Sequence, residues 1–308
     1  MTQASADCPP ANAAAARRKY GLAERRMMAA KPLARLVLLG VVLFGVPGCT
    51  TVSSGVKPRP SDAPIAFLLM GQSNMSGRGA TTDPAALMIE PDPRIKMLGN
   101  DGVIAMAREP IDSPVGQIDA VSVDRAAGVG PGLSFAKNLI ARQPGRHILL
   151  VPCAKGGSAI AAWRTDRDRT TLYGSCLARA QAAARDARIG GILWYQGESD
   201  AESLTLVGAW PSALSRLVRD LRRDLGQPHL PVIAVAIGDR PTKGSYGSRF
   251  PAWAAMQRAQ RAIRGRCLDV VSAAGLPRNA DGLHLSTTGE VALGAKLATA
   301  WIKIEQHC

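Results

Sequence analysis

Aromatic residues and histidine are scarce in this sequence. Phe, Trp and Tyr together make up 4% of the 308 residues, and only four residues are histidine. Proteins that bind single-stranded nucleic acid by stacking interleave aromatic residues with basic ones. No stretch of this chain does so, although its net charge is +14. The densest basic run, formed by Arg219, Arg222 and Arg223, is typical of a solvated helix face, so we expect no nucleic-acid partner.

Cysteine motifs that bind metal are also missing. The sequence contains no CxxC pair and no cluster of histidines, so it indicates neither a structural nor a catalytic zinc site. We expect neither a metal ion nor another cofactor.

Six cysteines are present, and two of them, Cys8 and Cys49, precede the folded region predicted below. The other four are Cys153, Cys176, Cys267 and Cys308. Four cysteines allow three pairings, and sequence alone does not choose among them. Proximity of the predicted elements favours disulfides from Cys153 to Cys176 and from Cys267 to Cys308. Buried free thiols are the alternative.

The sequence has no apolar run long enough to span a bilayer, which takes roughly 20 residues. The longest such run near the N-terminus, from Leu36 to Val46, has about a dozen residues. It follows Lys31 and Arg35 and leads to small residues that end at Cys49. This order is typical of a signal peptide, so we predict that the protein is exported.

Residues 46–49, VPGC, resemble a bacterial lipobox, in which the cysteine becomes the lipidated first residue. A lipid on Cys49 would hold the protein to a membrane as a periplasmic or outer-membrane lipoprotein. Because Pro47 departs from the usual pattern, ordinary cleavage and secretion stay as the alternative. We therefore predict a leader at 1–26 that is untranslated or disordered, a signal peptide at 27–48, a linker at 49–63 and one folded domain at 64–306.

Short apolar runs alternate with helix-period stretches from residue 64 onward. The runs, rich in branched residues, are PIAFLLM (64–70), HILLVP (147–152), GILWYQ (191–196), PVIAVAIG (231–238) and CLDVVSA (267–273). Such runs are typical of strands buried on both faces of a parallel sheet. Thr287 and Glu290 form a capping-box pattern before the last helix-period stretch. The alternation predicts a three-layer α/β/α sandwich.

Polar or glycine-rich loops follow several of these predicted strands. Ligands of such folds bind beyond the carboxyl ends of the strands, and Ser73 lies there in GQSNMSG. A serine needs a base to become a nucleophile. His284 is the only histidine in a post-strand loop, and Asp281 precedes it by three residues. This spacing lets the aspartate orient the imidazole toward Ser73, whereas Glu198 is an alternative partner for His284.

An acyl-transfer site also needs donors for the oxyanion. The candidates are the N–H of Ser73, the N–H of Gly130 and the side-chain amide of Gln196.

Five ordered blocks carry a family resemblance. They are GQSNMSGRG, VGPGLSFA, PCAKGGSAIAAW, WYQGESDA and DGLHLSTTGEVALG. Their order resembles the SGNH-type carbohydrate esterases grouped with sialate O-acetylesterases and acetyl xylan esterases, which are similar to carbohydrate esterase family 6. The resemblance covers about residues 64–304.

The resemblance implies a flavodoxin-like SGNH sheet and metal-free deacetylation. It implies that Ser73 is the nucleophile, His284 the base and Asp281 its orienting partner, with Gly130 and Gln196 as further oxyanion donors. The KGGSAIAAW segment is similar to the family's substrate-side loop, where Gly157, Ser158 and Trp163 would line the acyl or sugar site. Packing in the core is the alternative role of Trp163.

The sequence thus predicts a serine esterase that removes O-acetyl groups from a carbohydrate through an acetyl-enzyme. Acetylated sialic acid and xylan-type glycans are the expected substrate classes, and neither charge nor composition chooses between them. A lipase or thioesterase acting on non-sugar esters is one alternative. An inactive carbohydrate-binding lipoprotein is the other.

Overall fold

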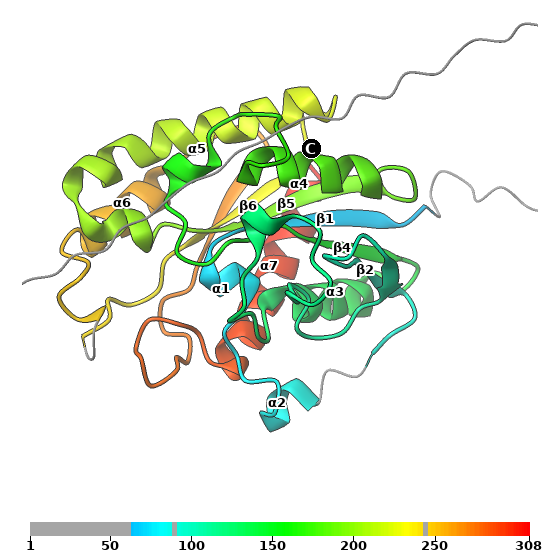
Figure 1. Cartoon of the computed structure of the whole chain (residues 1–308), viewed down its shortest axis with the longest axis horizontal. Coiled ribbons are helices and arrows are strands. Elements are labelled where there is room, and N and C mark those ends of the chain that lie inside the picture. The colour runs from blue at the N-terminus through cyan, green and yellow to red at the C-terminus, as the bar shows by residue number, and fades with distance from the viewer. Residues whose placement is uncertain (1–62, 88–90, 243–245) are drawn as a thin grey trace, which may run out of the picture. The chain divides into compact units, whose positions relative to one another are not determined.

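The computed structural model describes residues 63–87, 91–242 and 246–308 (Figure 1). These residues form a seven-stranded sheet of order β3-β2-β4-β1-β5-β6-β7. The strands are β1 (Ile65–Gly71), β2 (Ile95–Leu98), β3 (Ile104–Met106), β4 (Ile148–Pro152), β5 (Arg188–Tyr195), β6 (Val232–Ala236) and β7 (Leu268–Ser272). All neighbouring strands pair in parallel except β2 and β3.

Helices cover both faces of this sheet. They are α1 (Ser73–Ser76), α2 (Pro84–Leu87), α3 (Pro131–Arg142), α4 (Leu172–Ala183), α5 (Leu204–Asp224), α6 (Trp253–Ala262) and α7 (Thr287–Glu305). Figure 1 shows α3 and α7 on one face, with α4 and α5 on the other, and α6 packs against α5 and β6. The predicted three-layer α/β/α sandwich is therefore confirmed.

Local sequence explains why the central elements form. Every residue of β1 is buried, as expected for an apolar strand between two helical layers. Helix α5 starts after Ser203, whose side chain accepts a hydrogen bond from the backbone N–H of Leu206 at 3.2 Å. Its buried residues include Leu214 and Leu221, on one apolar stripe.

Three local features differ from the sequence-based expectations. The five predicted strands are present, but β2 and β3 were not predicted, because only the first and last residues of β2 are buried and all three residues of β3 are exposed. The N-cap of α7 is Ser286, which accepts from the Gly289 N–H at 3.3 Å. Thr287 instead donates its hydroxyl to the Ala80 carbonyl at 2.9 Å, so the capping-box prediction was wrong by one residue.

The structure pairs Cys153 with Cys176 and Cys267 with Cys308, the pairing that element proximity favoured. The first disulfide joins the segment after β4 to α4, and the second joins the segment before β7 to the C-terminus. They close loops of 23 and 41 residues. A disulfide that closes a loop of this size stabilises the folded protein by roughly 2–4 kcal/mol, because it restricts the unfolded chain.

The leader, the signal peptide and almost all of the linker, including Cys49, lie outside the described residues. Among the helices described in residues 63–308, with the two gaps given above, none is long and apolar enough to cross a membrane.

Candidate active site

Ser73 lies immediately beyond the carboxyl end of β1, in the first turn of α1. Gly71 precedes it with a φ of +133°, and a Cβ there would lie 2.0 Å from the Tyr195 carbonyl oxygen. Gly77 follows with a φ of +94°, and a Cβ there would lie 2.6 Å from the Gly130 nitrogen. Only glycine fits at either position. The two glycines thus let the serine turn contact both β5 and the segment that precedes α3.

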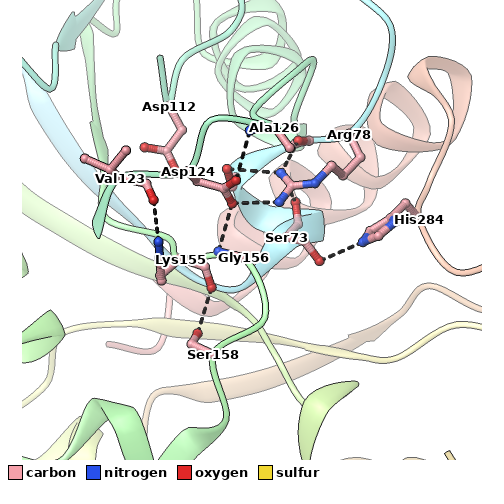
Figure 2. Close-up of polar contacts among 12 residues, drawn as sticks. Ser73, Arg78, Asp112, Val123, Asp124, Ala126, Lys155, Gly156, Ser158 and His284 are labelled. Carbon is pink, nitrogen blue, oxygen red and sulfur yellow. Dashed lines mark hydrogen bonds and ion pairs between the residues drawn. The ribbon is translucent and has the colours of Figure 1, made fainter. Parts of the chain in front are cut away.

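His284 faces Ser73 across the edge of the sheet (Figure 2). Its Nε2 is 3.0 Å from Ser73 Oγ, and its Nδ1 is 2.6 Å from Asp281 Oδ2. The other carboxylate oxygen of Asp281 accepts from the backbone N–H groups of Leu283 and His284 at 2.9 and 3.0 Å. The structure therefore places the three predicted residues in one hydrogen-bonded chain, with a base in contact with a serine hydroxyl.

The charge of Asp281 is favoured by its surroundings. Partial burial tends to raise the pKa of this carboxyl, but hydrogen bonds from the His284 ring and from the Leu283 and His284 backbone outweigh burial and lower its pKa. Asp281 is consequently ionised at neutral pH. An ionised partner fixes the imidazole tautomer and stabilises the imidazolium that forms when Ser73 loses its proton.

Asn74 sets the position of the serine turn relative to the histidine loop. Its Oδ1 accepts from the Leu285 N–H at 2.9 Å, and its Nδ2 donates to Glu198 Oε1 at 2.7 Å. Glu198 is 1% exposed, and burial raises its pKa to about 7. Glu198 therefore contacts Asn74, whereas the His284 ring contacts Asp281. These contacts favour Asp281 over Glu198 as the partner of His284.

Gln72 and Gln196 form a second buried contact below the turn. The Gln72 side-chain oxygen accepts from Gln196 Nε2 and from the Gly197 N–H, both at 3.3 Å. Gln196 Nε2 also donates to the Ser158 carbonyl at 3.1 Å and to Asp200. Its two N–H groups thus have protein acceptors, and its exposed fraction is 0%. The Gln196 amide therefore joins three loops in this structure, and its role as an oxyanion donor stays a prediction.

Backbone donors lie beside the nucleophile. The first N–H groups of a helix have no acceptor within that helix, and Ser73 begins α1. Gly130 caps α3, and a Cβ on it would lie 3.2 Å from the Met75 carbonyl oxygen and 3.4 Å from Gly77 Cα. Gly130 is therefore packed against the serine turn. The Ser73 and Gly130 N–H groups are the candidates for an oxyanion hole.

A buried carboxyl group supports the segment around Gly130. Glu109 Oε2 accepts from the Ile111 N–H at 3.0 Å and lies 3.5 Å from the Gly130 nitrogen. Burial, opposed by these two backbone contacts and reinforced by nearby Asp112, raises the pKa of Glu109 to about 8. The protonated form of Glu109 therefore predominates in the folded protein at neutral pH.

We predict that Glu109→Gln flattens the pH dependence of stability. The unfolded chain ionises this carboxyl near its ordinary pKa of 4.5, while the folded protein holds the proton to about 8. The stabilising contribution of that proton is complete below about 4.5 and is lost as pH rises through about 8. Calorimetric Tm values between pH 5 and 9 should therefore fall less in Glu109→Gln than in the wild type. Asp186→Asn, which removes an exposed carboxylate, is the control, and equal slopes in all three proteins would refute the prediction.

An ion pair that sequence reasoning missed ties the serine turn to the next loop (Figure 2). Arg78 donates to the Gly77 carbonyl and to Asp124 Oδ2, each at 2.7 Å. The same Asp124 oxygen accepts from the Gly156 N–H at 2.8 Å. Burial tends to raise the pKa of Asp124, but Arg78 outweighs it and lowers the pKa. Residues 78 and 124 are 46 positions apart, and no motif signals their contact.

The predicted substrate-side loop lines a hollow of about 520 Å³. Gly157 and Ser158 are among its lining residues, with Lys155, Arg164, Thr170 and Thr171. Trp163 is not among them. It is 1% exposed, packs edge-on against Trp194, and donates its indole N–H to Ser158 Oγ at 3.1 Å. The expectation that Trp163 contacts substrate is therefore corrected to a packing role, whereas Gly157 and Ser158 stay candidates.

Within residues 63–87, 91–242 and 246–308, no group of three or more His, Cys, Asp or Glu side chains is arranged to hold a metal ion.

Residues 65–303 match the model of a family described as "Carbohydrate esterase, sialic acid-specific acetylesterase". The Arabidopsis thaliana protein named "Probable carbohydrate esterase At4g34215" is 34% identical over 250 residues, which cover 77% of this chain and 89% of that protein. The X-ray structure of the Arabidopsis protein superposes with a TM-score of 0.67 at 32% identity, covering 78% of this chain and 98% of that one.

A third similarity covers a shorter stretch. The Escherichia coli K12 protein named "Probable 9-O-acetyl-N-acetylneuraminic acid deacetylase" is 32% identical over 123 residues, which cover 33% of this chain and 36% of that protein.

Proposed function

Since the chain belongs to the family of carbohydrate esterases described as sialic acid-specific acetylesterases, we propose that it removes O-acetyl groups from a carbohydrate by serine catalysis. The observation that carries this proposal is the hydrogen-bonded chain from Asp281 through His284 to Ser73, at the carboxyl edge of the sheet. A serine in contact with an oriented imidazole is the arrangement that acyl transfer requires.

The first half-reaction forms an acetyl-enzyme. Ser73 Oγ attacks the acetyl carbonyl carbon while His284 Nε2 takes the serine proton, and the negative charge on His284's partner Asp281 stabilises the resulting imidazolium. The Ser73 and Gly130 N–H groups are proposed to donate to the carbonyl oxygen as it becomes an oxyanion. His284 then protonates the sugar oxygen, the C–O bond to that oxygen breaks, and the deacetylated sugar leaves.

The second half-reaction restores the enzyme. His284 removes a proton from water, the resulting nucleophile attacks the acetyl carbon, and the bond to Ser73 Oγ breaks as His284 returns the proton to it. Acetate is the product. The residues around the site are suited to hold this geometry rather than to react, because Asn74 fixes the histidine loop and Arg78 with Asp124 fixes the substrate-side loop.

We propose an acetylated sialic acid or a xylan-type glycan as the substrate. The family description and the name of the E. coli relative support the first. The hollow beside Gly157 and Ser158, with the hydroxyl groups of Thr170 and Thr171 and the cations of Lys155 and Arg164, can donate to sugar hydroxyl or carboxylate oxygens.

Acetate release from purified protein tests this function. We expect release from 9-O-acetylated sialic acid or from acetyl xylan, and faster turnover of an aryl acetate than of an aryl ester with a long acyl chain. The Ser73→Ala protein supplies the background rate. Turnover of long-chain esters with no release from any acetylated sugar would favour a lipase or thioesterase, and no labelling of Ser73 by an organophosphonate would favour an inactive binding protein.

We propose that the protein is exported and anchored by a lipid on Cys49, on the strength of the apolar run and the VPGC motif at residues 36–49. Mass spectrometry of the mature N-terminus checks this. An unmodified N-terminus at or after Cys49 would indicate ordinary cleavage and secretion instead.

A further inference from the structure

The arginine run in the sequence is joined by a second basic segment in the structure. A hollow of about 580 Å³ opens between the C-terminal end of α5, the segment after α6 and the start of β7. Five arginines line it, and the lining contains no Asp or Glu. They are Arg219, Arg222, Arg223, Arg264 and Arg266.

Three of these arginines are not neutralised by a carboxylate in the described part of the chain. Arg222 donates to the carbonyl oxygens of Leu230, Arg266 and Cys267 at 2.8–2.9 Å. Arg264 likewise donates only to nearby carbonyls, and Arg266 is exposed. Carbonyl acceptors orient a guanidinium but leave its charge uncompensated.

The other two arginines have acidic neighbours outside the hollow. Arg223 pairs with Asp220 and Asp224 at 2.7 and 2.8 Å, and Arg219 lies 3.6 Å from Asp220. The unpaired charge is therefore concentrated on Arg222, Arg264 and Arg266. A solvated helix face would place its arginines outward along one helix, whereas these come from two separate segments and surround one hollow.

The lining also has an apolar part, made by Val218, Pro228 and Leu268. Guanidinium groups bind phosphate oxygens in a bidentate manner and are more weakly hydrated than ammonium groups. A ligand with one phosphodiester beside short apolar chains would match both parts of the lining. An anionic phospholipid headgroup has this chemistry.

The hollow lies at the amino ends of the strands, and the catalytic serine lies at the opposite, carboxyl ends. Leu268 begins β7 and Pro228 precedes β6, so the hollow is at the amino ends of parallel strands, whereas Ser73 follows the carboxyl end of β1. The described chain starts at residue 63, just before β1, at the same edge. Figure 1 shows the end of α5 and the start of β1 to the right of α1.

We propose that this arginine hollow binds the phosphodiester headgroup of an anionic membrane lipid. Binding there would hold the edge where the chain enters the domain against the membrane surface. The catalytic edge would then face away from the membrane, open to a carbohydrate. This proposal does not depend on the esterase activity. Turnover of an ester can therefore be used to check that a variant is correctly folded.

Titration of the full-length chain with dihexanoylphosphatidylglycerol below its micellar concentration tests the proposal. We expect saturable binding by the wild type in calorimetry, weakened at least about tenfold in the Arg264→Gln/Arg266→Gln double variant because two charge-assisted hydrogen bonds are lost. The matched control is Arg216→Gln/Arg258→Gln, which removes the same charge from exposed positions of α5 and α6 outside the hollow. The control should bind as the wild type does.

Three results would overturn the proposal. The first is an unchanged lipid affinity in the Arg264→Gln/Arg266→Gln variant, and the second is an equal loss of affinity in the control variant. The third is binding of inorganic phosphate as tight as that of the lipid, which would indicate a site for free phosphate. Turnover of an aryl acetate should be unchanged in both variants. If the double variant loses turnover through misfolding, Arg266→Gln alone replaces it, because that side chain is exposed, and the same three criteria then apply.

Discussion

Ser73→Ala should lower kcat/KM for an aryl acetate by about 10⁴-fold or more, because no other group can form the acetyl-enzyme. Ser73 Oγ is the hydrogen-bond partner of His284 Nε2, at 3.0 Å. The hydroxyl contributes little to packing, so the Tm of the variant should stay within a few degrees of the wild type. Steady-state hydrolysis and a thermal melt of the same preparation measure both quantities.

Ser76→Ala is the matched control for this substitution. Ser76 lies in the same short helix and is equally buried, but its hydroxyl contacts the Arg78 guanidinium at 3.4 Å rather than His284. We expect Ser76→Ala to keep activity within about tenfold of the wild type, as is usual for a lost contact of modest strength. Near-normal turnover in Ser73→Ala would exclude the acetyl-enzyme mechanism.

Asp281→Asn should lower kcat by about 10³- to 10⁴-fold with a smaller change in KM. The carboxylate oxygen 2.6 Å from His284 Nδ1 requires a proton on that nitrogen, which leaves Nε2 free to accept the serine proton. An amide nitrogen in its place would donate to Nδ1 and favour the opposite tautomer. A kcat that falls while the Tm is maintained would show that the loss is chemical and not a failure to fold.

Glu198→Gln is the comparison that separates the two candidate partners of His284. A glutamine can still accept the hydrogen bond that Asn74 Nδ2 donates to Glu198 Oε1, and the glutamate is largely neutral below about pH 7, where its raised pKa lies. We therefore expect a loss of no more than about tenfold. If Glu198→Gln were more damaging than Asp281→Asn, the assignment of Asp281 would be wrong.

The parts of the fold that could be predicted are the buried strands, because each of them is a short continuous run of apolar residues in the sequence. The strands β1, β4, β5 and β6, which are buried almost throughout, and the partly buried β7 read as continuous apolar runs. The strand β2 and the edge strand β3 do not, because the two middle residues of β2 and all three residues of β3 are at least partly exposed and carry no distinct period. The N-cap of α7 was misplaced because Ser286, Thr287 and Thr288 are all plausible caps, and only tertiary contacts give Thr287 another acceptor.

The candidate site shows the same division. Ser73, Asp281 and His284 could be found because nucleophile, base and orienting acid have few alternatives in a chain with four histidines. Arg78 and Asp124 could not, since an arginine and an aspartate 46 residues apart are indistinguishable from many others until the chain folds. The same holds for Trp163, whose indole could pack or bind sugar with equal ease.

The sequence by itself therefore determined the positions of five strands along the chain, the glycines at positions 71 and 77, and the identity of the reacting groups, because these depend on local residue pattern, backbone freedom and residue chemistry. Only the tertiary structure decided which side chains hold those groups. Asn74 fixes the histidine loop, the Gln196 amide donates hydrogen bonds that join three loops, and five arginines from two segments surround one hollow. Contacts between residues distant along the chain depend on how the layers pack, and that packing leaves no signature in any single stretch of sequence.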